Sequence, residues 1–482
     1  MAHRITVLPK KLNIDAANDD TLLSVLRSTG LTVDAPCGGD GRCGKCRVIV
    51  DGAEMLACKT VVDRDMTVTL PHAGFHSSPQ DKTSTFKVPV LHEDGYLLAF
   101  DIGTTTVVGY LLNNKTELAS VCLRNPQAAF GADVMSRIRL AVQGQQEALT
   151  DSIRHCLETL THMICQQAGI LPGAIKCVSV VGNPAMQQFL LDIPVDNLAK
   201  VPFSPILTQA KTIPAKDSLP LMENAELLIV PDIAGFVGAD TVACVLATEM
   251  VAREEMTLLV DIGTNAEMVL GNRHRMVACS AAAGPALEGA CIRFGMYGQE
   301  GAIDHIWLEK GQITCSVIGG GTARGICGSG LLDAIAVALE QKLLNERGKI
   351  LTDDSLIHLT DSIYLTQEDI RQVQLAKGAI AAGIQLMASH MGVALSEIQK
   401  VYLAGAFGTY MDPKSACKIG LLPKELENKI TAVGNAAGRG AGILACSRDA
   451  RELAQRIVSH TETLELSTLP EFPRCFAKNM RF

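Results

Sequence analysis

Residues 97–106, LLAFDIGTTT, decide the fold, because residues 258–267, LLVDIGTNAE, repeat them later in the chain. In both copies an apolar run leads into the sequence Asp-Ile-Gly-Thr. A second apolar run follows each copy, over residues 107–112 and 268–270. This pattern predicts a strand, a tight turn and a second strand, built twice in one chain.

Each turn carries residue types that suit a polyphosphate. Glycine lets the backbone approach a phosphate, threonine hydroxyls and backbone N–H groups donate hydrogen bonds, and an aspartate at a strand end can hold hydrated magnesium. One such turn could equally be an ordinary hairpin, but two copies favour a nucleotide gripped from both sides. We therefore expect ATP with Mg²⁺, and we expect Asp101 and Asp261 to position magnesium and water. The expected phosphate contacts are Gly103, Thr104, Thr105, Gly263, Thr264 and Asn265.

Two further glycine-rich segments are candidates for the remaining walls of this pocket. Residues 325–330, GICGSG, precede an apolar helix whose N-terminal N–H groups could face a nucleotide. Residues 401–408, VYLAGAFG, are typical of a strand that runs into a turn against adenine or ribose. Either segment could instead hold a helix cap or packing glycines. The expected contacts are Gly328, Ser329, Gly330, Gly405, Ala406, Phe407 and Gly408.

Two acidic residues are candidates for orienting the water that attacks ATP. Asp240 lies two residues after Gly238, and Glu267 follows the second turn. Each could also be a capping or surface acid.

Four cysteines near the N-terminus follow the spacing C-x5-C-x2-C-x11-C: Cys37, Cys43, Cys46 and Cys58. This spacing is typical of a [2Fe-2S] ligand set, and the glycines among them let backbone N–H groups approach the sulfurs. A zinc site would usually show two CxxC pairs, and the thiols could also be incidental. The cluster remains the favoured interpretation, and it indicates single-electron chemistry.

Composition restricts the remaining classes. With 482 residues, 48% hydrophobic and 4% aromatic, the chain suits an α/β protein of two to four domains. A net charge of −8 argues against nucleic-acid binding. No apolar run approaches the length of a membrane span, and scattered cysteines elsewhere suit a reducing compartment, so we expect a cytoplasmic protein with no membrane association.

The pattern along the chain predicts an α/β multidomain protein. Residues 1–74 read as a β-grasp, ferredoxin-like [2Fe-2S] domain and residues 75–95 as a flexible linker. Residues 96–482 form the expected ATP-binding domain, with lobes at roughly 96–250 and 251–482.

The paired turns, with LAGAFG at residues 403–408, resemble the acetate kinase, sugar kinase, heat-shock chaperone and actin superfamily. The resemblance covers roughly residues 95–465 and implies two actin-like lobes with ATP between them. Behind a [2Fe-2S] domain, this part looks like the reductive activators of corrinoid proteins. Further stretches carry that likeness: residues 125–127, 131–138, 181–186, 238–240, 280–290 and 470–482. Some relatives have an extra domain after the linker, where this chain has only about 20 residues.

This resemblance implies that one electron passes from the cluster to a corrinoid protein and reduces Co(II) to Co(I) in a methyltransferase system, driven by ATP hydrolysis. It also implies an external low-potential electron donor and a possible homodimer. Ser280, Gly284 and Glu288 are the expected partner-facing residues. The alternatives are an activator of another low-potential enzyme such as a 2-hydroxyacyl dehydratase, a small-molecule kinase with a ferredoxin module, and a non-enzymatic electron carrier that senses nucleotide.

Overall fold

The computed structural model describes residues 2–8, 12–29, 33, 35, 39, 41, 46–70 and 95–482. Cys37, Cys43 and nearly all of the predicted linker lie outside these residues. Among the helices that are described, none combines the length and the apolarity that crossing a bilayer requires.

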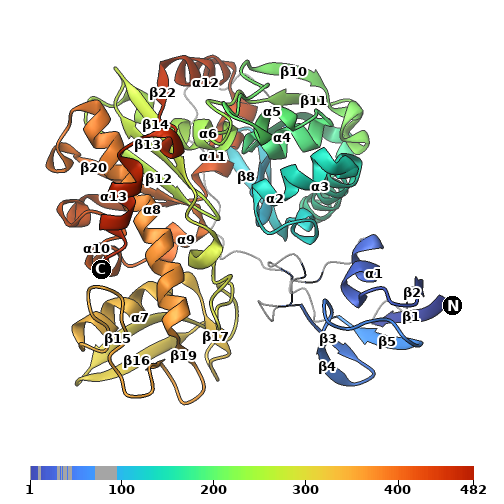
Figure 1. The fold of residues 1–482 in the computed structure, drawn as a ribbon. Helices are drawn as coiled ribbons and strands as arrows, with labels where there is room; N and C mark the ends of the chain where they lie inside the picture. The colour runs from blue at the N-terminus through green and yellow to red at the C-terminus, as the bar shows by residue number, and fades with distance from the viewer. Residues whose placement is uncertain are drawn as a thin grey trace.

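The N-terminal unit is a five-stranded sheet packed against one helix (Figure 1). Its strand order is β2-β1-β5-β3-β4, and β1 pairs parallel with β5. The Thr21 hydroxyl accepts a hydrogen bond from Ser24 N at 3.2 Å and so caps the helix. Leu22 and Leu26 are buried against strand residues such as Ile5. This is the β-grasp arrangement that the sequence predicted. The elements are β1 (Ala2–Leu8), β2 (Leu12–Ala17), α1 (Leu22–Ser28), β3 (Arg47–Val50), β4 (Ala53–Leu56) and β5 (Met66–Thr69).

The first lobe is built on a six-stranded sheet in the order β10-β11-β9-β6-β7-β8. Its strands are β6 (Tyr96–Ile102), β7 (Thr106–Asn113), β8 (Thr116–Arg124), β9 (Ile175–Gly182), β10 (Lys211–Pro214) and β11 (Glu226–Ile229). Its helices are α2 (Val134–Leu140), α3 (Gln146–Ala168), α4 (Pro184–Leu191), α5 (Asp196–Ala199) and α6 (Ala239–Ala247).

The second lobe has a six-stranded sheet in the order β21-β20-β12-β13-β14-β22. Its strands are β12 (Thr257–Ile262), β13 (Ala266–Gly271), β14 (Met276–Ala281), β20 (Lys400–Ala404), β21 (Ile430–Gly434) and β22 (Thr461–Thr463). Its helices are α8 (Gln367–Met391), α9 (Gly405–Tyr410), α10 (Pro413–Lys418), α11 (Ala436–Cys446), α12 (Arg448–His460) and α13 (Phe472–Asn479). An inserted unit holds β15 (Ala302–Glu309), β16 (Gln312–Val317), β17 (Gly325–Ile326), α7 (Gly328–Glu340), β18 (Ile357–His358) and β19 (Tyr364–Leu365).

The two large sheets repeat one topology, as the doubled sequence predicted. In the first lobe β6, β7 and β8 are antiparallel, and β9 lies parallel to β6 on its other side. In the second lobe β12, β13 and β14 are antiparallel, and β20 lies parallel to β12. The Asp-Ile-Gly-Thr turns therefore occupy equivalent places, after the first strand of each sheet.

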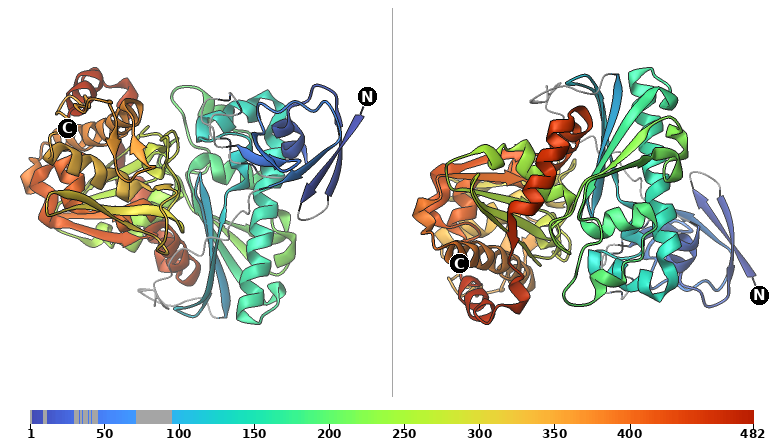
Figure 2. Two further views of the ribbon diagram at one scale, coloured as in Figure 1. Left: turned by 90° about the horizontal axis from the view of Figure 1, so that it is seen from below. Right: turned by 90° about the horizontal axis from the view of Figure 1, so that it is seen from above.

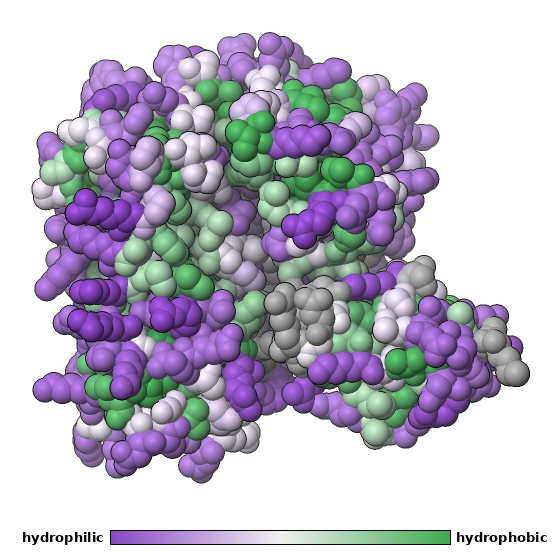
Figure 3. Space-filling view, viewed as in Figure 1, coloured by the Kyte–Doolittle hydropathy of each residue, from purple (hydrophilic) through white to green (hydrophobic). Residues whose placement is uncertain are grey.

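A hydrophobic core joins the lobes around α6 and α11, which pack together between the sheets (Figures 1 and 2). It includes Leu97 and Ala99 from β6 together with Leu259 and Val269 from the second lobe. Although α11 follows residue 251, it packs against β6 and β9, and the Ser179 hydroxyl donates to the Ala441 carbonyl at 2.6 Å. The space-filling view is hollowed between the lobes (Figure 3).

Candidate functional site

The two predicted phosphate turns face one another across the lobes. The hydroxyl oxygens of Thr105 and Thr264 are 3.2 Å apart. The first turn needs its glycine, because a Cβ on Gly103 would lie 2.8 Å from the Thr106 carbonyl oxygen. The structure thus brings together two turns that are far apart in the sequence.

Three side chains of the first lobe hold the first turn in place. The Asn125 amide donates to the Gly103 carbonyl at 2.8 Å, and the Arg137 guanidinium donates to the Thr104 carbonyl at 2.6 Å. The Asn183 amide donates to the Thr104 hydroxyl at 3.4 Å. Asn125 and Arg137 are fully buried, so this turn is preorganised by the protein interior.

Four half-buried carboxylates gather beside the turns. Asp101 and Asp261 lie at the ends of β6 and β12, Asp240 lies in the first turn of α6, and Glu267 lies on β13. Burial raises the pKa of Asp101 to about 7, with further increases from Asp240 and Asp261. Burial and Asp261 likewise raise the pKa of Asp240 to about 7. Burial and the charges of Asp240 and Asp261 raise the pKa of Glu267 well above its usual value.

This cluster of acids fits a magnesium–nucleotide complex. Within the described part of the chain, no three acidic, histidine or cysteine side chains converge closely enough to hold a metal ion by themselves. Magnesium usually takes only one or two protein carboxylates and completes its shell with water and phosphate oxygens. Burial and the neighbouring carboxylates disfavour the charged forms of Asp101 and Asp240, and a bound cation would stabilise those charged forms. Asp101 and Asp261 are therefore suitable magnesium-positioning residues.

Asn435 is a site residue that the sequence prediction missed. Its amide donates to Asp101 Oδ2 at 2.8 Å, and its carbonyl oxygen accepts from Gly438 N at 2.7 Å as the N-cap of α11. The two contacts fix the side chain in one orientation. The available signal was the glycine-rich segment GNAAGRGAG at residues 434–442, which resembles the other glycine turns.

Gly405, at the start of α9, lies against Asp261, and its contact with a nucleotide stays a prediction. Its φ is +86°, and a Cβ there would lie 2.8 Å from Asp261 Oδ1 and from the Ile262 carbonyl oxygen. Ala406, Phe407 and Gly408 follow it within α9. Phe407 packs on Gly328 and is partly buried in the second-lobe core.

Residues 328–330 show the packing that the alternative interpretation predicted. A Cβ on Gly328 would lie 1.9 Å from the Leu287 carbonyl oxygen, and one on Gly330 would lie 2.5 Å from the Ile303 carbonyl oxygen. The Ser329 hydroxyl donates to the Asp304 carbonyl at 2.8 Å. All three residues at the start of α7 are buried in protein contacts, and their contact with a nucleotide stays a prediction.

Two of the expected partner-facing residues point into the site. The Ser280 hydroxyl donates to Glu267 Oε1 at 3.1 Å. Glu288 Oε2 accepts hydrogen bonds from the hydroxyls of Thr105 at 3.0 Å and Thr264 at 2.9 Å. Gly284 precedes Glu288 and starts the short helix Pro285–Glu288 with a φ of +74°. These contacts place Ser280 beside Glu267 and Glu288 between the paired turns, and a role of these residues toward a partner stays a prediction.

The described part of the cysteine loop suits a metal cluster. The Cys46 and Cys58 sulfurs are 3.2 Å apart and form no disulfide, and Cys58 N donates to Cys46 Sγ at 3.5 Å. Gly39 and Gly41 have φ values of +111° and +75°, which explains the need for glycine there. Thiolates with a backbone N–H donor are the usual [2Fe-2S] environment.

Comparisons with known proteins agree with both parts of this description. The 2Fe-2S iron-sulfur cluster binding domain matches residues 5–68, the RACo middle region matches 96–253, and the C-terminal ASKHA domain of RACo matches 255–482. The chain therefore has a [2Fe-2S] domain and an actin-like, nucleotide-binding ATPase domain, and the expected fold class is confirmed. The domain and lobe boundaries stay predictions.

Individual relatives cover almost the whole chain. The corrinoid activation enzyme RamQ of Eubacterium limosum is 30% identical, with 97% of each chain covered. That alignment spans 582 positions, so at least 100 of them have no residue in this chain. A [Co(II) methylated amine-specific corrinoid protein] reductase of Methanosarcina barkeri is 28% identical over 79% of this chain and 76% of its own.

A solved structure shows the same architecture. The reductive activator for corrinoid, iron-sulfur protein is 26% identical and superposes with a TM-score of 0.74, covering 100% of this chain and 98% of that one. Sequence and structure together show that the chain belongs to the RACo family of corrinoid reductive activators.

Proposed function

We propose that this protein uses ATP to drive one electron from its [2Fe-2S] cluster to a corrinoid protein, reducing Co(II) to Co(I) in a methyltransferase system. One observation carries the proposal: a single chain joins a cysteine loop for one-electron transfer to a paired-turn ATP site. Two relatives are named as a corrinoid activation enzyme and a corrinoid protein reductase.

Energetics explain why ATP and the cluster would share one chain. Ferredoxin-type clusters lie near about −400 mV. Transfer to an acceptor of lower potential costs about 1.4 kcal/mol for each 59 mV of gap. ATP offsets this cost only if its binding or hydrolysis changes the affinity for one partner state relative to another. The lobes, which meet at the ATP site, are the elements whose closure ATP controls.

Each group of side chains has a distinct role in this scheme. Asp101 and Asp261 hold hydrated magnesium, whose charge neutralises the phosphates. Thr104, Thr105, Thr264 and Asn265 contact phosphate oxygens. Asp240 and Glu267 orient the attacking water. Within the cluster domain Cys37, Cys43, Cys46 and Cys58 hold the iron ions. The external electron donor, a homodimer and a cytoplasmic location stay predictions.

The test is anaerobic reduction of a purified Co(II) corrinoid protein by the reconstituted, pre-reduced chain, with and without Mg–ATP. Loss of the Co(II) absorption with appearance of Co(I) only in the presence of ATP is the expected result. Asp261→Asn should retain the cluster spectrum and lose the ATP-dependent reduction. Equal reduction without ATP would contradict the proposal and favour a simple electron carrier. Transfer of phosphate to a small molecule would favour a kinase.

A further inference from the structure

The contact between Glu288 and the two phosphate turns goes beyond the roles assigned so far. One carboxylate oxygen accepts from Thr105 of the first lobe at 3.0 Å and from Thr264 of the second at 2.9 Å. It therefore binds both hydroxyls that the nucleotide phosphates are expected to use. No other carboxylate in the described residues is seen to bridge the two turns in this way.

The polar neighbours of Glu288 suit an anion. Burial is the largest influence and leaves the pKa of Glu288 raised, while the hydroxyls of Thr264 and Thr105 and the nearby Arg124 and Arg137 lower it. Hydroxyl donors with arginines close by are also the groups that bind phosphate. The chain's own carboxylate thus occupies a place whose chemistry suits a phosphate.

Geometry prevents the carboxylate and a phosphate from sharing this place. The Thr105 and Thr264 hydroxyl oxygens are 3.2 Å apart, which is the length of one hydrogen bond. A phosphate oxygen bound by both hydroxyls would take the place of Glu288 Oε2, which already accepts from both, and its charge would repel the Glu288 carboxylate. Phosphate binding between the turns must therefore remove Glu288 from the two hydroxyls.

We propose that Glu288 mimics a nucleotide phosphate. Without nucleotide its carboxylate holds the two turns, and hence the two lobes, together as a latch, and a bound nucleoside triphosphate displaces it. The proposal rests on the nucleotide-binding part of the proposed function. In this proposal Glu288 sets the affinity for nucleotide. It also couples nucleotide binding to the position of residues 282–290, the segment that contains Glu288.

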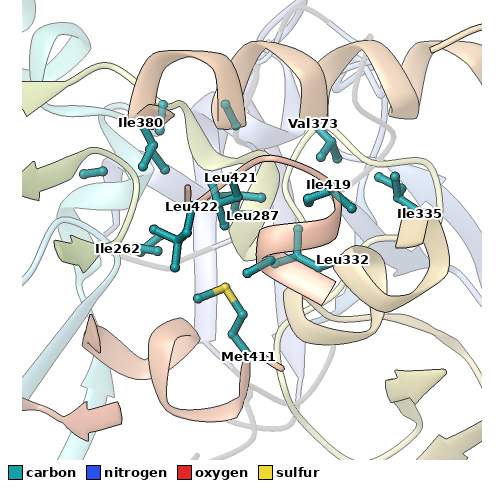
Figure 4. Close-up of a cluster of buried hydrophobic side chains, with 14 of the residues drawn as sticks. Ile262, Leu287, Leu332, Ile335, Val373, Ile380, Met411, Ile419, Leu421 and Leu422 are labelled. Atoms are coloured by element: carbon teal, nitrogen blue, oxygen red, sulfur yellow. The ribbon is translucent and has the colours of Figure 1, made fainter. Parts of the chain in front are cut away.

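The segment around Glu288 is built to transmit that displacement. Glycines with φ values of +74° and +78°, Gly284 and Gly289, flank the helix Pro285–Glu288. The preceding Leu287 is fully buried and points into the core with Leu332 of α7 and Leu421 (Figure 4). The Leu287 carbonyl packs directly against Gly328 at the start of α7, so a shift of the backbone at Glu288 would reach that helix.

Binding of Mg–AMPPNP, measured by calorimetry on the full chain, tests the latch without any corrinoid protein. Glu288→Gln removes the negative charge but keeps the shape, and we expect the Kd to fall about tenfold or more. The matched control is Glu309→Gln, on the exposed end of β15, with no expected change. Unchanged or weaker binding by folded Glu288→Gln would overturn the proposal, as would a wild-type protein that does not bind Mg–AMPPNP.

Hydrogen exchange on the wild-type chain gives a second test that does not depend on how a variant folds. Mg–AMPPNP should increase amide exchange in residues 282–290, because the latch contacts are lost. Unchanged or slower exchange in that segment would refute displacement. If both tests give the expected results but the wild-type chain never reduces Co(II), the proposed function is refuted and the latch proposal is not.

Discussion

The side-chain amide of Asn435 donates a hydrogen bond to Asp101 Oδ2 at 2.8 Å, joining the start of α11 to the end of β6. Asn435 Oδ1 also accepts a hydrogen bond from Gly438 N, so the side-chain N–H₂ faces Asp101. A flip of the amide group would break the helix cap. One residue thus orients the carboxylate that we propose positions magnesium, and it caps a helix that packs on both lobes.

Replacing Asn435 by aspartate should reduce ATP turnover strongly. The variant keeps the cap acceptor but places a second carboxylate against Asp101, where like charges repel. Asn435→Ala should lose both contacts and cost about 1–3 kcal/mol of unfolding free energy. Steady-state ATPase rates and chemical denaturation of the two variants measure these effects. Wild-type turnover in folded Asn435→Asp would show that the contact has no role in positioning Asp101.

Asp101 should make the nucleotide-free protein less stable as the pH rises. Burial raises the pKa of Asp101 from 3.8 to about 7 in the folded chain. Between about pH 4 and pH 7 the folded chain therefore keeps a proton on Asp101 that the unfolded chain has released. The stabilisation is complete below pH 4 and is lost as the pH rises through 7. Asp101→Asn should therefore unfold at higher denaturant than wild type at pH 8, by at least about 1 kcal/mol.

At pH 5 the unfolding free energies of wild type and Asp101→Asn should differ much less, because Asp101 in the folded chain is then mostly protonated. Asp361→Asn, at an exposed acid, serves as the control and should show no such pH-dependent difference. A constant gap between Asp101→Asn and wild type from pH 5 to pH 8 would contradict the raised pKa.

Gly405→Ala should abolish nucleotide binding because the new methyl group meets Asp261. The Cβ would lie 2.8 Å from Asp261 Oδ1, in addition to the strain of a φ of +86°. Gly320→Ala is the matched control, since Gly320 has a φ of +72° and no atom within 4 Å of the added Cβ. Both variants should lose about 1–2 kcal/mol of stability from backbone strain. Only Gly405→Ala should fail to bind Mg–AMPPNP in calorimetry.

Cys58→Ser should remove the cluster without affecting the ATP site. Its sulfur lies 3.2 Å from that of Cys46, and serine is a poor substitute for a thiolate on iron. The visible absorption and the EPR signal of the reduced protein should be lost, while Mg–AMPPNP affinity stays within about twofold of wild type. Cys291→Ser, at an exposed cysteine outside the loop, should leave the spectrum intact. An unchanged spectrum in Cys58→Ser would remove Cys58 from the ligand set.

The sequence by itself determined the features that depend on local chemistry. The local sequence Asp-Ile-Gly-Thr at the end of a strand is enough to specify a glycine turn with threonine hydroxyls. Two copies of it therefore predicted the paired sheets and turns. Cysteine spacing on one glycine-rich loop likewise predicted the cluster domain, because those ligands need little help from the rest of the fold.

Tertiary structure alone decided which distant side chains complete the site. Asn435 and Asp101 are 334 positions apart, and Glu288 and Thr105 are 183 apart, so no local pattern connects them. Residues 328–330 show the same limit from the other side. Their position at a helix start predicted a nucleotide contact, and the structure packs the Leu287 and Ile303 carbonyls directly against them. Close packing between elements, which a local motif does not encode, determines whether a glycine meets a ligand or the protein itself.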